Sequence, residues 1–243
     1  MAREFSAEPA QVYRHHPGPA DYLYAIAERL PRRWRPPASG VDAAPVVARG
    51  VRDLTLIMSA VDTIPPRTPK AIARHDEVIS AALGAEVVLP LPFGTVLPAL
   101  EVDDWLAGHL ALIQAYLPRL RGRMEMTVRL VSLTPGAQAG TSLRATAERL
   151  VERAGVADWL YRDGGLGGLV STLAFLVPRD GVGEFLVRVA PVAARAGDVA
   201  VVPTGPWAPS SFAPPLPVPG LATVGERLAR AGLSGLAVDR GFE

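Results

Sequence analysis

The 243-residue sequence contains no cysteine. Disulfide bonds, thiolate nucleophiles, zinc–thiolate sites and iron–sulfur clusters are therefore all excluded. No apolar run approaches the ~18–20 residues of a membrane span, so we expect no membrane partner. The first twenty residues are polar and lack the apolar core of a secretory signal, and a cytoplasmic protein is the expectation.

A strong charge of either sign is also missing. The 25 basic and 24 acidic residues leave a net charge of +1, so we expect no nucleic-acid surface built on bulk charge. Aromatic residues make up only 6% of the chain, whereas hydrophobic residues make up 49% and charged residues 20%. That balance is typical of a globular protein, and the length allows one large domain or two small ones.

Turn-forming residues are abundant, with 24 prolines and 23 glycines. Between these turns the hydrophobic pattern of the first half predicts the order β-β-β-α-β-α. Thr68 is suited to cap the first helix, with Pro69 at its first position, Gly84 at its end and Gly122 after the second helix. The predicted elements are strands at 22–27, 44–48 and 54–61, a helix from 69 to 84, a strand within 86–97 and a helix at 99–121.

The second half predicts the order β-α-β-β-α-β, which is that of a ferredoxin-like split βαβ unit. Its elements are strands at 123–133, 158–163, 169–177 and 198–204, with helices at 141–154 and 183–197. The predicted fold class is α+β, with two ferredoxin-like sandwiches in series, the first of them modified, and a proline-rich C-terminal tail. The predicted divisions are a flexible arm at 1–19, domains at 20–122 and 123–205, and a tail at 206–243.

Residues suited to catalysis or metal binding are few. The chain has four histidines; two of them, His15 and His16, lie in the predicted arm. His75 and His109 lie on apolar helix faces, where a core histidine bonded to backbone is favoured over a general base. An enzyme with a ligand site around either one stays open as an alternative. No H-E-x-x-H motif occurs, and the prediction is no catalytic, metal or cofactor site.

The stretch "VVPTGPWAPSSFAPP" at 201–215 allows three interpretations. Its serines could be nucleophilic, but they lack the G-x-S-x-G context. Its prolines could be a ligand for another protein's aromatic groove, which would make the chain an adaptor. The favoured interpretation is that Gly205 and Pro206 turn the chain, so that Trp207 and Phe212 cover apolar surface at a sheet edge or domain junction.

Two stretches resemble the gas vesicle GvpL/GvpF family. One is "RHDEVISAALGAEVVLPLPFGTVLPALEVDDWL" at 74–106, with a helical histidine before a strand and an "FGTV" loop. The other runs from "LAFLV" at 173 to "VAVVPTGPWAPSSF", ending at 212, and matches the family's C-terminal strand, helix and strand. The resemblance covers about residues 20–215 in the same order. Pro92, Ala208 and Ser210 depart from the family's usual arginine, proline and tyrosine.

The resemblance implies a non-enzymatic accessory protein of gas vesicle formation, with two α+β domains and no cofactor. It implies that the partners are the hydrophobic shell protein and other gas vesicle accessory proteins, and that the protein is found at the gas vesicle and in the cytoplasm. The "FGTV" loop and the start of the helix at 99–121 are candidate contact surfaces. The candidate contact or signature positions are His75, Phe93, Gly94, Thr95, Gly205, Pro206, Trp207 and Phe212.

Overall fold

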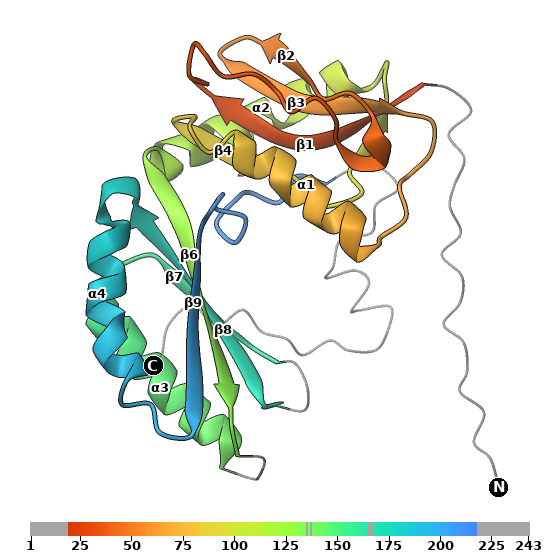
Figure 1. Cartoon of the computed structure of the whole chain (residues 1–243). Coiled ribbons are helices and arrows are strands. Elements are labelled where there is room, and N and C mark those ends of the chain that lie inside the picture. The colour runs from red at the N-terminus through yellow and green to blue at the C-terminus, as the bar shows by residue number, and fades with distance from the viewer. Residues whose placement is uncertain (1–18, 135, 137, 165–167, 218–243) are drawn as a thin grey trace, which may run out of the picture.

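The computed structural model describes residues 19–134, 136, 138–164 and 168–217. Two antiparallel sheets follow one another along this part of the chain, each with its own helices, which confirms the α+β class (Figure 1). The predicted arm, except Pro19, and the tail beyond 217 lie outside the described residues. None of the described helices combines the length and apolar content that a membrane crossing needs.

The first sheet is built around a strand that is buried along its whole length. β1 (Ala20–Glu28) pairs with β3 (Leu54–Val61), which in turn pairs with β2 (Val47–Val51). β4 (Val87–Pro90) and β5 (Val96–Pro98) share the other edge of β1, one pairing with each end of it. The sequence pattern predicted only one strand here, and the loop 91–95 between the two runs along the middle of β1.

Two helices accompany the first sheet. α1 (Pro69–Ala81) begins as predicted, because the Thr68 hydroxyl accepts the Ala71 N–H at 3.1 Å. It ends before Gly84, because the Ala82 N–H bonds the Ile79 carbonyl and tightens the last turn. α2 (Val102–Leu120) is followed by Gly122 at φ +65, as predicted for a helix end.

The two helices pack on opposite faces of the first sheet. Residues of α1 share a buried cluster with Tyr22, Tyr24 and Ile57, whereas residues of α2 share another with Leu23, Leu56 and Leu89. The prediction of a ferredoxin-like sandwich is wrong for this half, because that arrangement places both helices on one face. Both faces of β1 are apolar, so each face needs its own cover.

The second sheet follows the predicted element order. The elements are β6 (Arg123–Ser132), α3 (Ala139–Ala154), β7 (Trp159–Asp163), β8 (Val170–Pro178), α4 (Val182–Ala193) and β9 (Val199–Trp207). The strand order is β7-β8-β6-β9, and all pairs are antiparallel. Figure 1 shows α3 and α4 along one face of this sheet, over a mainly apolar core that also contains the buried Thr146 of α3.

The last strand is longer than predicted. It continues through Pro203 and Pro206 to Trp207, which pairs with Glu125 after a shift in register. The pattern predicted an end at 204, with Gly205 and Pro206 turning the chain, but both residues lie within β9. An edge strand tolerates proline where its missing N–H faces away from the ladder. α4 likewise contains Pro191 and ends at Ala193, four residues before the predicted Gly197.

Candidate partner-binding surface

His75 is a buried residue of α1 with both ring nitrogens bonded. Its Nδ1 lies 2.9 Å from the Tyr22 hydroxyl, and its Nε2 lies 3.1 Å from the Leu91 carbonyl oxygen. Only 3% of the residue is exposed. Burial lowers the pKa of His75 to about 4, which keeps the ring neutral near pH 7. The core interpretation is therefore the one that the geometry favours, since neither nitrogen is free for catalysis.

The loop at 93–95 is built onto the same network. The Gly94 N–H donates to the Tyr22 hydroxyl at 3.1 Å, and the Phe93 ring packs edge-on against His75 with centroids 5.6 Å apart. Thr95 is fully buried, and its hydroxyl donates to the Pro92 carbonyl at 2.6 Å. Four of the candidate positions thus lie together, but they are largely interior and they hold the loop against β1.

Tyr24 extends this network, with its ring centre 5.6 Å from that of His75. Its hydroxyl lies 3.1 Å from the Ser59 hydroxyl and accepts the Val41 N–H at 2.9 Å. A Cβ on Gly40 would lie 2.0 Å from the same hydroxyl, so the backbone can approach only because that residue is glycine. Sequence reasoning gave no role to the hydroxyls of Tyr22, Tyr24 and Ser59, although the aromatic alternation in "YLYAIA" placed both tyrosines on a buried strand.

The C-terminal stretch is held by a buried carboxylate on β6. Glu125, 4% exposed, accepts the Ser211 N–H and the Ser211 hydroxyl, each at 2.8 Å. A Cβ on Gly205 would lie 2.9 Å from the Glu125 carbonyl oxygen, and Gly205 adopts φ +118. These contacts fix the backbone on both sides of Trp207. The alternating strand pattern gave no sign that Glu125 would face the protein interior.

The two aromatic side chains of this stretch have different surroundings. Phe212 is 4% exposed and joins the α2 side of the core, with the Arg119 guanidinium 5.7 Å from its ring centre. Trp207 is 45% exposed, so its side chain is not buried as that of Phe212 is. The edge position of β9 leaves it open. Residues 208–217 lie between the two sheets in Figure 1, and Ala208 packs on the α1 side.

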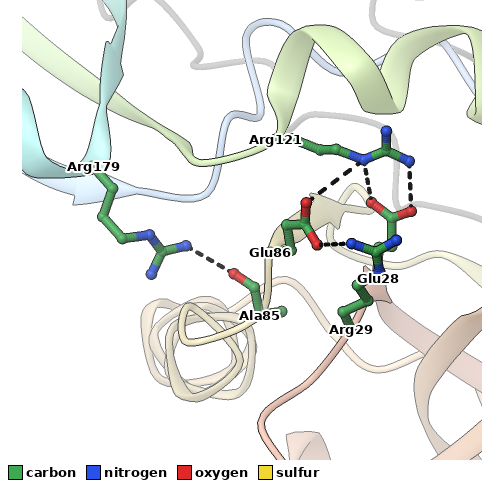
Figure 2. A network of polar contacts seen from close by, with 6 residues as sticks. All are labelled: Glu28, Arg29, Ala85, Glu86, Arg121 and Arg179. Atoms are coloured by element: carbon green, nitrogen blue, oxygen red, sulfur yellow. Dashed lines mark hydrogen bonds and ion pairs between the residues drawn. The ribbon is translucent and has the colours of Figure 1, made fainter.

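A network of polar contacts joins the first sheet to the start of the second (Figure 2). Arg121 donates two hydrogen bonds to the Glu28 carboxylate, each at 2.8 Å, and lies 3.9 Å from Glu86. Arg29 donates to Glu86 at 2.8 Å. Arg179, from the other side, donates to the backbone oxygen of Ala85. It also donates to the backbone oxygen of Leu83. The bonds from Arg121 lower the pKa of Glu28.

One cavity borders both of the stretches that carry the resemblance. It has a volume of about 250 Å³ and is lined by Asp76, Ile79, Ser80, Pro90, Trp207, Ala208 and Ser210. Asp76 comes from α1, one residue after His75, and Trp207 ends β9. Asp76 was not among the predicted positions. Within the described ranges, no three or more histidine, aspartate or glutamate side chains are placed to bind a metal ion.

A comparison with protein families identifies one match that spans most of the chain. The model of the family described as "Gas vesicle synthesis protein GvpL/GvpF" matches residues 20–139 and 134–214. Both matched ranges together contain the "FGTV" loop and the "TGPW" stretch.

Individual proteins agree with this match. The chain is 26% identical over 168 residues to "Gas vesicle protein F2" of Halobacterium salinarum, which is 66% of this chain and 76% of that protein. The crystal structure of GvpF from Anabaena sp. PCC7120 superposes with a TM-score of 0.70 at 18% identity, covering 82% of this chain and 97% of the other. GvpF from Microcystis aeruginosa gives 0.67 at 16% identity, covering 81% and 99%. The chain belongs to the GvpL/GvpF family of gas vesicle synthesis proteins.

Proposed function

We propose that this protein is a non-enzymatic accessory protein of gas vesicle formation, which binds the hydrophobic shell protein, other accessory proteins or both during assembly. The observation that carries the proposal is the family match from residue 20 to residue 214, which supports a role in gas vesicle formation. The protein would act in the cytoplasm and at the vesicle. We further propose the divisions 20–122 and 123–205, with the second extended to Trp207 because β9 ends there. We also propose a ferredoxin-like identity for the second, which its strand order β9-β6-β8-β7 supports.

The start of α2 and the neighbouring edge of the first sheet are the surface we propose for the shell protein. Leu100, just before α2, is 94% exposed, and Val47 on β2 is 46% exposed. Arg49 on β2 forms an ion pair with Asp103 in the first turn of α2, at 2.9 Å, which ties the two together. β2 pairs only with β3 among the described strands, so its other edge is available to an added strand.

The "FGTV" loop is less suited to direct contact, because Gly94 and Thr95 are buried and bonded within the fold. We propose that its role is to fix β4 and β5 on the edge of β1. The free edge of β9 is also less suited to strand addition, since Pro203 and Pro206 have no N–H to offer.

Co-expression with the shell protein tests the proposal. Affinity capture of this chain should retain the shell protein, and deleting the gene from a vesicle-forming host should abolish flotation. If the shell protein and the other accessory proteins are all absent from the captured fraction and vesicles form normally without the chain, the proposal is wrong.

Two exposed substitutions locate the contact. Leu100→Ser together with Val47→Thr should lower shell-protein capture without lowering the melting temperature. Leu133→Ser is the matched control, because Leu133 is 63% exposed but follows β6 in the second unit. Equal capture by both variants would move the contact elsewhere.

A further inference from the structure

The cavity between α1 and the end of β9 has a composition that points to a particular ligand. Among the seven residues that line it, Asp76 is the one charged group. Within the part of the chain that the structure describes, no hydrogen bond or ion pair is formed by its carboxylate. Asp76 is an exposed residue whose partial burial raises the pKa of its carboxyl group.

Trp207, the last residue of β9, also lines the cavity, and it is 45% exposed. An indole is the aromatic ring that attracts a cation most strongly. Its backbone is fixed before the ring by Gly205 against β6 and after the ring by Ser211 on Glu125. The backbone on both sides of the ring is therefore fixed, which reduces the conformational entropy that is lost when a partner binds.

The cavity is small and open to solvent. Its volume of about 250 Å³ lies below the ~300 Å³ at which pockets for drug-sized molecules begin, and its exposed lining residues are Asp76, Ser80, Trp207 and Ser210. One long side chain fits such a space, with its aliphatic stem beside Ile79 and Pro90. Ser80 and Ser210 supply hydroxyl groups that can accept hydrogen bonds from a cationic head.

From these features we propose that the cavity receives an arginine or lysine side chain presented by a protein partner. The cationic head pairs with the Asp76 carboxylate and lies against the Trp207 indole. Arginine fits better than lysine, because a planar guanidinium both stacks on an aromatic ring and donates several hydrogen bonds. The site depends on both units, since Asp76 belongs to α1 and Trp207 to β9. The inference rests on the proposed function in one respect only, namely that the partner is a gas vesicle protein.

A direct titration tests the site without any partner. The probe is acetyl-arginine amide, and the readout is the indole signals of protein labelled with ¹⁵N-tryptophan, with the Trp207 signal identified by its loss in Trp207→Phe. A saturable shift of the Trp207 signal is expected. Acetyl-citrulline amide, which has the same shape without the charge, should produce much less.

Asp76→Asn should weaken the arginine titration about two- to fivefold, because it removes the charge and keeps the shape. Asp104→Asn is the matched control, since Asp104 is an exposed acid in the first turn of α2 and should leave the titration unchanged. The inference is overturned if the Trp207 signal does not move, if citrulline acts as well as arginine, or if Asp76→Asn binds as the wild type does.

Capture of gas vesicle proteins separates this inference from the proposed function. If the wild type captures a partner and Asp76→Asn captures at least severalfold less, the cavity is part of that contact. If capture by the two is equal, the inference is overturned while the proposed function stands. If the wild type captures no gas vesicle protein, the proposed function fails, and the titration alone decides whether the cation site exists.

Discussion

The two stretches that mark this chain as a family member are used in different ways by the fold. In the first, His75 and the loop 93–95 are mostly interior and their polar atoms bond to one another and to β1, whereas Asp76 beside them is exposed. The second runs from the surface into the core within six residues, with Trp207 half open and Phe212 buried. A signature residue can therefore mark either a folding constraint or a surface contact, and only its surroundings tell which.

The difference follows from the neighbouring elements. β4 and β5 extend the first sheet on both sides of the loop 91–95, so hydrogen bonds to β1 enclose it. β9 has β6 on one side only, and the chain leaves the sheet after Trp207 before Glu125 holds Ser211. Substitutions at His75 and the loop 93–95 should therefore lower the free energy of unfolding. In the second stretch, only substitutions at the buried end should do so.

The largest expected effect is at Phe212. Phe212→Ala should lower the free energy of unfolding by about 3–5 kcal/mol, because it leaves a cavity where the ring joins the α2 side of the core. Urea unfolding followed by circular dichroism measures this. Phe212→Leu keeps most of the volume and should lose much less. A loss near zero for the alanine variant would show that the second stretch is not anchored in the core.

The next effect is a pH dependence at His75. Its pKa is about 4 in the folded protein and 6.5 when unperturbed, so between these values the unfolded chain binds a proton that the folded protein excludes. Stability therefore falls as pH falls, by roughly 2 kcal/mol between pH 7 and pH 5.

His75→Gln should remove that part of the pH dependence while the variant remains folded at pH 7. Urea unfolding of both proteins at pH 7 and pH 5 gives the difference. If the wild type and the variant lose equal stability over this range, His75 is not a buried neutral histidine. The region around it is then more accessible to water than in the structure.

Local signals in the sequence predicted most of the elements. Thr68 and Pro69 identified the start of α1, Gly122 the end of α2, and alternation identified β6, because each signal acts over a few residues. The failures were at places decided by distant partners. β9 extends through two prolines because it lies at an edge, and the helices of the first sheet separate because both faces of β1 are apolar.

The site was harder to predict for the same reason. His75 was correctly expected to be a core residue from its position on an apolar helix face, but its Tyr22 partner is 53 residues away. The contacts of Glu125 with Ser211, and of Arg121 with Glu28, join residues 86 and 93 apart. No periodicity encodes such pairs. The cavity at Asp76 exists only where two separate stretches meet.

A smaller effect should come from the serine that Glu125 holds. Ser211→Ala removes a hydroxyl that donates to a buried carboxylate at 2.8 Å, which should cost about 1.5 kcal/mol of unfolding free energy. Ser210→Ala is the matched control, because the Ser210 hydroxyl lies 3.5 Å from the same carboxylate and the residue is exposed. Equal losses of unfolding free energy in the two variants would mean that Glu125 does not bond to Ser211 in preference to Ser210.

The smallest effect on stability should be at Trp207. Trp207→Ala should cost less than about 1 kcal/mol, since the residue is 45% exposed and its indole N–H makes only a 3.4 Å contact with the Thr204 hydroxyl. Urea unfolding beside Phe212→Ala gives the comparison under identical conditions. A loss approaching that of Phe212→Ala would show that the ring is packed in solution and unavailable to a partner. A small loss combined with a large drop in partner capture would instead place the role of Trp207 at the surface, because a side chain that contributes little to folding yet controls binding must act in the bound state.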